Sequence, residues 1–164
     1  MIRGTVRTGD GKECRKRALN DIVISREGFS RLIGLDVYVN GSFLNAYEGD
    51  GIIISTPTGS TGYNLSAGGP IVDPMARLMI ITPVCPHSLT SKSIVLPSDA
   101  KVSIEIAKRK TQDTEAIVSF DGGNDFELAA GDVLDICVSQ RTTQLVKASD
   151  VNFYEILRNK LGGK

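Results

Sequence analysis

The sequence has a single histidine, only three cysteines, no tryptophan and no long apolar run. Cys14, Cys85 and Cys137 are odd in number and widely spaced, which matches neither a disulfide framework nor a zinc site. No apolar run approaches the ~20 residues of a membrane-spanning helix, and the polar N-terminus lacks the pattern of a signal peptide. We therefore expect reduced thiols and a cytoplasmic location.

An excess of charge of either sign is also missing. Nineteen basic residues balance nineteen acidic residues, so nothing indicates a surface for nucleic acid or for an anionic membrane. The 164 residues suffice for one domain that buries roughly 70% of its extended surface. Because no repeat, low-complexity tract or linker interrupts the chain, we treat 1–164 as a single domain.

Short β-type segments at regular spacing make up most of the chain. Asn40-Gly41 is the strongest hairpin signal, and no alternation of strands with helices predicts a parallel sheet. The fold class that we predict is all-β, a β-sandwich of many short strands. Its strands are expected over 1–7, 13–17, 19–24, 31–39, 42–47, 52–54, 77–82, 93–96, 101–107, 116–120, 126–129, 133–138 and 143–147.

Two helices are expected in addition to the strands. Ser60 or Thr61 can cap a short internal helix that runs to about Ala67 and is stopped by Gly68-Gly69-Pro70. A C-terminal helix follows from apolar residues at helical spacing, with Asp150 as its cap and Gly162 at its end. Its apolar face must be covered by the domain or by a partner, and packing on the sandwich is the simpler expectation.

The densest polar cluster follows the apolar run at 52–54. In residues 55–61 every residue except Pro57 and Gly59 carries a hydroxyl, and a helix is expected to start there. We call residues 56–66 the elbow. It suits a polar, phosphate-bearing ligand, although hydroxyl-rich turns also occur without any ligand. The chain contains neither a P-loop nor a Gly-x-Gly-x-x-Gly fingerprint.

Other polar residues each have a structural and a functional interpretation. Asp50 is either a turn residue or a carboxylate acceptor beside the elbow. Asn20 and Asp21 either start a strand or bind a base edge and a ribose diol, since together they offer donors and acceptors. His87 lies in a proline-rich loop, after Pro83 and Pro86, without a Gly-x-Ser-x-Gly elbow, which favours a loop anchor. Residues 121–124 are expected to form only a hairpin turn.

The chain resembles the NAD kinases, also known as ATP/polyphosphate-NAD kinases, almost from end to end. The main resemblance is Gly-Asp-Gly-Ile-Ile-Ile-Ser-Thr-Pro-Thr-Gly-Ser-Thr-Gly-Tyr at 49–63 with Leu-Ser-Ala-Gly-Gly-Pro at 65–70. Further pieces keep the family's order: Ala-Leu-Asn-Asp at 18–21, Pro-Val-Cys-Pro-His-Ser-Leu at 83–89, Ser-Phe-Asp-Gly at 119–122 and Phe-Tyr-Glu-Ile-Leu-Arg at 153–158.

The resemblance covers only the C-terminal domain of that family. It implies a parent enzyme with an N-terminal α/β domain, whose Gly-Gly-Asp-Gly-Thr motif supplies the expected catalytic base, followed by the β-sandwich. This chain lacks the motif, because Glu48 precedes Gly49-Asp50-Gly51 and Ile52 follows it. We therefore expect an excised or separately made C-terminal half with no catalytic residue of its own.

The resemblance also implies residue roles. Asn20 would contact the adenine side of NAD, and Asp21, where the family usually has Glu, the ribose hydroxyls. Asp50 and Ser66 would hold the nicotinamide carboxamide, in many family members across a subunit interface. Thr58, Thr61 and Tyr63 would line the dinucleotide pocket together with Gly62, which is usually Ala in the family.

The implied reaction transfers the γ-phosphoryl group of ATP, or a phosphoryl group of polyphosphate, to the 2′-hydroxyl of the adenosine ribose of NAD. Such a transfer needs in-line positioning, Mg²⁺ or another divalent cation, and a base. Partners implied are NAD and NADP, the N-terminal domain and further copies in a dimer or tetramer. The alternatives are a non-catalytic dinucleotide-sensing or assembly module and a related lipid kinase, although the elbow favours NAD.

Overall fold

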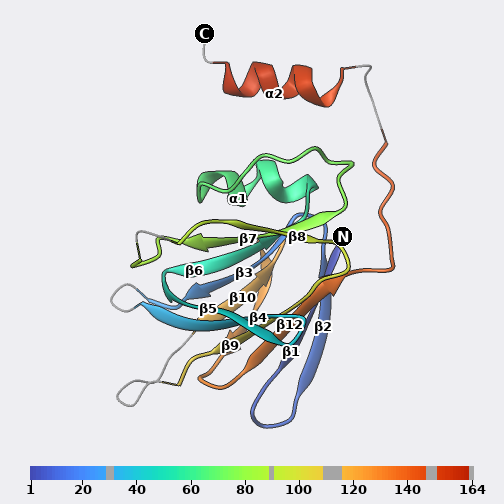
Figure 1. Cartoon of the computed structure of the whole chain (residues 1–164). Helices are drawn as coiled ribbons and strands as arrows, with labels where there is room; N and C mark the ends of the chain where they lie inside the picture. Colours follow the sequence, from blue (N-terminus) through green and yellow to red (C-terminus); the bar gives the residue numbers. More distant parts are fainter. Residues whose placement is uncertain (29–31, 89–90, 109–115, 147–150, 163–164) are drawn as a thin grey trace.

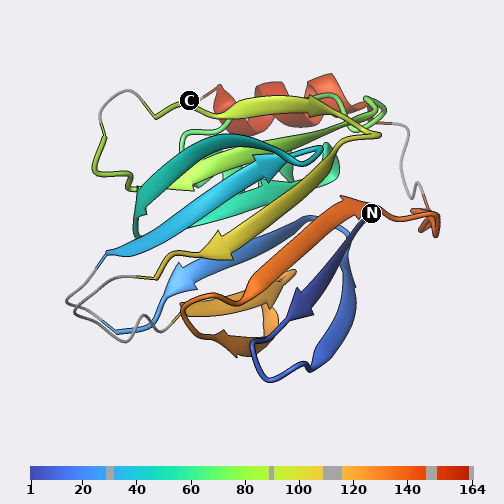
Figure 2. The same cartoon turned by 60° about the horizontal axis from the view of Figure 1, so that its bottom comes forward.

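The structure, a computed structural model, describes residues 1–28, 32–88, 91–108, 116–146 and 151–162, without the side chains of 124 and 125. Within these ranges the chain forms two six-stranded sheets in which every pairing is antiparallel. The sheets pack face to face (Figures 1 and 2). The predicted all-β sandwich is therefore confirmed.

Each sheet combines strands that are far apart in the sequence. The first sheet has the order β2 (Glu13–Ala18), β1 (Ile2–Arg7), β12 (Val133–Val138), β9 (Lys101–Ile106), β4 (Ile33–Val39) and β5 (Ser42–Gly49). The second has the order β11 (Gly123–Leu128), β10 (Ala116–Phe120), β3 (Asp21–Arg26), β6 (Gly51–Ser55), β7 (Leu78–Val84) and β8 (Ile94–Pro97).

Burial patterns explain why the two sheets differ. In β1, Ile2 and Val6 face the core while Arg3 and Arg7 face solvent, as expected of a sheet with one solvent-exposed face. In contrast, all five residues of β6 are buried. The helical segment of the elbow contacts β6 and covers the outer face of the second sheet (Figure 1). A strand covered on both faces needs a continuous apolar run, which Ile52, Ile53 and Ile54 supply.

Two hairpin turns set the register around the core. Asn40 and Gly41 have φ of 52° and 81°, the positive values that a two-residue primed turn needs, which confirms the predicted hairpin between β4 and β5. Asp121 and Gly122, with φ of 54° and 69°, join β10 to β11 in the same way. The strand after this turn begins at Gly123, so the turn is shorter and the strand longer than predicted.

The strand predicted over 143–147 is wrong over its described part. Residues 141–146 have no regular secondary structure, and Val146 is 92% exposed. The preceding strand, β12, is already paired on both sides, with β1 and with β9. Apolar side chains such as Leu145 and Val146 therefore find no sheet edge to join here. Lys147 lies outside the described residues.

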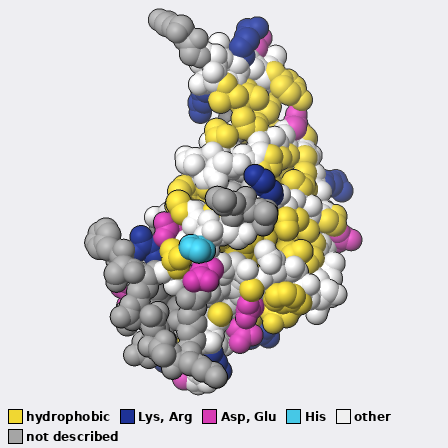
Figure 3. Space-filling view, turned by 60° about the vertical axis from the view of Figure 1, so that its left-hand side comes forward, with side chains coloured by type: hydrophobic (Ala, Val, Ile, Leu, Met, Phe, Trp, Pro, Cys, Tyr) yellow, Lys and Arg dark blue, Asp and Glu magenta, His cyan; other side chains and the backbone are white. Residues whose placement is uncertain are grey.

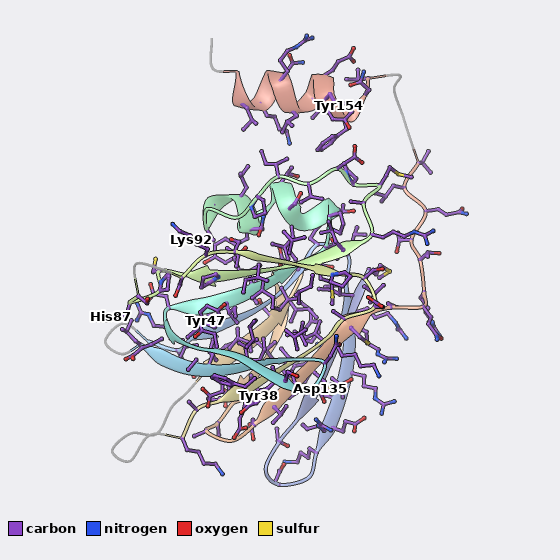
Figure 4. The ribbon with its side chains drawn as sticks, viewed as in Figure 1. Tyr38, Tyr47, His87, Lys92, Asp135 and Tyr154 are labelled. Carbon is purple, nitrogen blue, oxygen red and sulfur yellow. The ribbon has the colours of Figure 1, made fainter. Side chains whose placement is uncertain are left out.

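The C-terminal helix, α2 (Phe153–Leu161), forms as predicted but has a different cap. Asn152 and Glu155 form a capping box, whereas the predicted cap, Asp150, lies outside the described residues; Gly162 ends the helix as expected. No residue of α2 is buried. The Tyr154 hydroxyl donates to the Asp73 carboxylate (2.6 Å), which lowers the pKa of Asp73 (Figure 4).

The apolar side chains of α2 are directed largely toward the rest of the domain (Figure 3). Three of its large hydrophobic residues nevertheless stay exposed, namely Tyr154, Ile156 and Leu161. Within the described residues no helix combines the length and the apolar character needed to cross a membrane.

Candidate functional site

The elbow connects the end of β6 to two short helical turns. A 3₁₀ turn, η1, covers Thr58–Thr61, and a single α-helical turn, α1, covers Tyr63–Ser66. Gly62 stands between them, and no side chain caps either turn, so the prediction that Ser60 or Thr61 caps the helix is wrong. The predicted end is close, because Ala67 follows the last turn and Gly68 has a φ of 80°.

Thr56 ties the elbow to the start of β3. Its hydroxyl donates to the Leu19 carbonyl (2.6 Å) and accepts from the Gly59 N–H (3.1 Å), and its own N–H donates to the Asn20 carbonyl (2.8 Å). At Gly59 an added Cβ would lie 2.1 Å from the Asn20 carbonyl oxygen. Only glycine allows this approach, so the predicted turn glycine in fact serves a tertiary contact.

Buried polar groups hold the other side of the elbow. The Ser60 hydroxyl bonds both the N–H and the carbonyl of Val72, which is why it is not free to cap a helix. The Asn64 amide donates to the carbonyls of Ser60 and Pro70 (both 3.0 Å) and accepts from the Thr82 hydroxyl (2.7 Å). We did not predict a role for Asn64; an amide within a hydroxyl-rich segment was the only sign of it in the sequence.

The Asn20–Asp21 pair starts β3 beside the elbow. Asp21 is 7% exposed, and burial, followed by the negative charge of Asp121, raises the pKa of its carboxyl group. A Cβ added at Gly62 would lie 3.9 Å from Asp21 Oδ2, so this carboxylate faces the junction of η1 and α1. The side chain of Asn20 is exposed. Two chain segments singled out from the sequence thus meet in space.

The remaining predicted site residues of the elbow lie along its accessible side. Thr58 is partly buried, Thr61, Gly62 and Ser66 are exposed, and Tyr63 is 48% exposed. A cavity of about 390 Å³ opens at the start of the elbow. Its lining includes Thr56, Pro57 and Thr58 from the elbow, with Met1, Arg77 and Ser98 from neighbouring segments.

Asp50 is not beside the elbow within the chain, which corrects that expectation. It precedes β6 and the elbow follows it, so the length of the strand, roughly 16 Å, separates Asp50 from the strand's other end. Asp50 Oδ1 accepts from Arg26 Nε (2.7 Å), and its backbone bonds Arg26 and Val84 (both 3.0 Å). The register is antiparallel, with Asp21 opposite Ser55 and Ser25 opposite Gly51. Asp21 and Asp50 therefore mark opposite ends of the β3–β6 pair.

His87 lies at the surface near the Asp50 end of the sheet (Figures 3 and 4). Its backbone N–H donates to the Glu48 carbonyl (2.7 Å), which fits the anchoring interpretation of this loop. Among the described residues no three His, Cys, Asp or Glu side chains gather to hold a metal ion. All three cysteines are free thiols.

Residues 19–148 match the family described as the ATP-NAD kinase C-terminal domain. The NAD kinases of Lachnoclostridium phytofermentans and Agathobacter rectalis are both 52% identical to the chain, over 90% and 93% of its length. These alignments cover 52% and 54% of those proteins, so the chain spans about half the length of the curated relatives that it matches.

Two solved structures extend the comparison to the fold. Yeast NADH kinase complexed with NADH superposes with a TM-score of 0.88 at 28% identity, covering 98% of this chain and 49% of that one. An NAD kinase from Archaeoglobus fulgidus in complex with ATP gives 0.69 at 28% identity, covering 85% and 51%. The chain belongs to the ATP-NAD kinase C-terminal domain family, as its sequence motifs predict.

Proposed function

We propose that this chain is the NAD-binding half of an NAD kinase that works in the cytoplasm and converts NAD to NADP. The observation that carries the proposal is the meeting of the Asp21 carboxylate with the Gly62 junction of the elbow. Burying a carboxylate without a neighbouring cation costs free energy. Hydrogen bonds from a bound ligand would offset that cost. The NADH complex of the yeast relative supports a dinucleotide as that ligand.

The adenosine end of NAD would lie along β3 and the elbow. Asn20 offers an amide donor and acceptor for the edge of the adenine base, from an exposed side chain. Asp21 accepts from ribose hydroxyls and in this way fixes the diol whose 2′-hydroxyl is to be phosphorylated. Thr58 and Thr61 add hydroxyls, while the half-exposed ring of Tyr63 offers a flat face for stacking on a base.

The nicotinamide end would be held by Ser66 and Asp50. Asp50 and the elbow lie at opposite ends of β6, and Asp50 is bonded to Arg26 and Val84 rather than to the elbow. We therefore propose that Asp50 reaches the carboxamide from a second copy of the chain, in a dimer or tetramer. This assigns the oligomer a direct part in binding.

The chemistry would come from outside this chain. We assign no catalytic base here, and we propose that it lies in an N-terminal α/β domain together with the site for ATP or polyphosphate. The described residues supply no set of three metal-ligating side chains. What the chain contributes is positioning, which by itself supplies a large share of a phosphoryl-transfer rate enhancement.

The decisive experiment measures NAD binding and NADP formation with ATP and Mg²⁺. The complete protein encoded by the gene should form NADP, whereas residues 1–164 alone should bind NAD weakly at best and form none. Clear turnover by residues 1–164 would overturn the assignment of the chemistry to another domain. NAD binding by a complete protein that forms no NADP would support the alternative, a dinucleotide-sensing or assembly module. Phosphorylation of a lipid in competition with NAD would point to a lipid kinase.

A further inference from the structure

We propose that Asp121 is a positioning residue for the Asn20–Asp21 pair and so for the ribose that the kinase phosphorylates. This inference rests on the proposed function. Sequence patterns alone make Asp121 a turn residue, and it does occupy the first position of the β10–β11 turn with a φ of 54°. Its carboxylate, however, is directed at another part of the chain about one hundred residues earlier.

The carboxylate gathers three successive backbone donors. Oδ2 accepts from the Leu19 N–H (2.7 Å), and Oδ1 accepts from the N–H groups of Asn20 (2.7 Å) and Asp21 (3.1 Å). In return the N–H of Asp121 donates to the Asp21 carbonyl (3.0 Å). Four hydrogen bonds therefore join one turn residue to the segment that carries both predicted adenosine contacts.

The elbow holds the same segment from its other side. The Asn20 carbonyl accepts from Thr56, and Gly59 lies against it so closely that no Cβ would fit. The Asn20 peptide is thus fixed between the elbow and Asp121, and its exposed side chain is left to contact a ligand. If the Asp121 carboxylate is lost, the elbow keeps its own buried network around Asn64, while the segment at 19–21 loses the three hydrogen bonds that this carboxylate accepts.

Only a carboxylate satisfies this arrangement. All three groups that it meets are N–H donors, and an ionised carboxylate is an acceptor with about four lone-pair sites. An asparagine would turn its NH₂ group toward at least one of the three donors. Hydrogen bonds to a charged acceptor are also stronger than those to a neutral one.

Asp121 acts on Asp21 electrostatically as well. Its negative charge adds to burial in raising the pKa of Asp21. Ser55, opposite Asp21 on β6, is neutral, and the elbow contains no acidic or basic side chain. Asp121 is therefore the charged group whose removal should change the pKa of Asp21. Replacing it should therefore move the acid limb of NAD binding, where Asp21 becomes ionised, to lower pH.

The test compares Asp121→Asn and Asp121→Gly with the wild type in the complete encoded protein. Both replacements tolerate a positive φ, so the turn should survive. We expect KM for NAD to rise roughly tenfold or more, which corresponds to the loss of charge-assisted hydrogen bonds. We expect kcat to change much less and the acid limb to shift to lower pH. Asp10→Asn, in the turn after β1, is the matched control and should leave KM unchanged.

Each outcome separates the two proposals. If the wild type does not bind NAD, the proposed function fails and this inference falls with it. If the wild type binds NAD and both variants keep its KM and pH profile, only the inference is overturned. Loss of the folded state in both variants would also overturn it, because Asp121 would then serve the stability of the sandwich rather than the site.

Discussion

The two ends of β6 differ in the burial and the charge of the groups around them. At the Ser55 end the neighbouring groups are mostly neutral hydroxyls, amides and carbonyls, and they are buried and joined by hydrogen bonds through Thr56, Ser60 and Asn64. At the Asp50 end the side chains are charged and partly exposed, with an ion pair to Arg26. The first end has two charged groups, Asp21 and Asp121, within a network of neutral hydrogen bonds, and the second has a partly exposed ion pair.

This difference indicates that the two ends contribute unequally to the stability of the fold. A ligand site is precise when its supporting groups are locked by a satisfied network, and buried networks of this kind are costly when one member is removed. A partly exposed ion pair is screened by solvent and contributes little to folding. Disruption should therefore affect stability strongly at the elbow and weakly at Asp50, and the following predictions test that order.

Gly59→Ala should have the largest effect. The new Cβ would lie 2.1 Å from a backbone oxygen of Asn20, so the backbone of one of the two segments would have to shift. We expect a loss of about 3 kcal/mol or more in the free energy of unfolding, measured by chemical denaturation. Gly9→Ala is the control, since its Cβ would meet nothing closer than 3.8 Å. Equal stability of the two variants would mean that the elbow does not depend on this contact.

Asn64→Ala should come next. It leaves the carbonyls of Ser60 and Pro70 without the amide donor that they have in the folded chain, and it removes one of two partners of the Thr82 hydroxyl, which keeps Ser93 (2.9 Å). The expected loss is about 2–3 kcal/mol of unfolding free energy. Asn45→Ala, at an exposed position of β5, should change stability by less than about 0.5 kcal/mol. If Asn64→Ala scarcely changed the free energy of unfolding, water would be replacing the hydrogen bonds of the amide.

Asp21→Asn should weaken NAD binding roughly tenfold or more, since a charged acceptor is lost, but it should make the free chain more stable at neutral pH. The unfolded pKa is about 3.9, and burial and Asp121 raise the folded pKa. The folded state therefore binds more protons between these values, and stability falls as the pH rises through that window. The asparagine variant has no carboxyl group at this position, so its stability should not fall in this way as the pH rises.

Thermal unfolding across pH checks this prediction, with Asp36→Asn in β4 as the control. The stability advantage of Asp21→Asn should vanish below the unfolded pKa, where the carboxyl group of Asp21 is protonated in both the folded and the unfolded wild type. An advantage that is independent of pH would contradict the electrostatic explanation.

The parts of the structure that the sequence predicts well are those with local causes. The strand predicted over 1–7 and the Asn40-Gly41 turn depend on neighbours in the chain, and both are confirmed. The errors have distant causes. Ser60 does not cap a helix because its hydroxyl bonds Val72, and Asp121 does more than turn the chain because its partners are at 19–21.

The candidate site follows the same rule. Family motifs marked Asn20, Asp21 and Gly62, and the structure brings these segments together. The place of Asp50 at the far end of β6 could have been predicted, because the strand expected at 52–54 stands between Asp50 and the elbow. The buried partner network of Asn64 could not, since Pro70 and Thr82 reach it only through tertiary folding.

The ion pair at the Asp50 end should show the smallest effect on stability. Arg26 and Asp50 are 23% and 34% exposed, so their interaction is screened, and we expect a coupling energy of about 0.5–1 kcal/mol from a double-mutant cycle of Arg26→Gln and Asp50→Asn. The more exposed pair of Arg7 and Asp135, cycled in the same way, should give less still.

The small effect of Asp50 on stability should not extend to function. Because Asp50 is proposed to hold the carboxamide, Asp50→Asn should raise KM for NAD in the complete protein although it scarcely changes unfolding. Arg7→Gln should change neither quantity. A coupling energy above about 2 kcal/mol, with no effect on KM, would make the pair a structural element of the sandwich and remove the contrast between the two ends of β6.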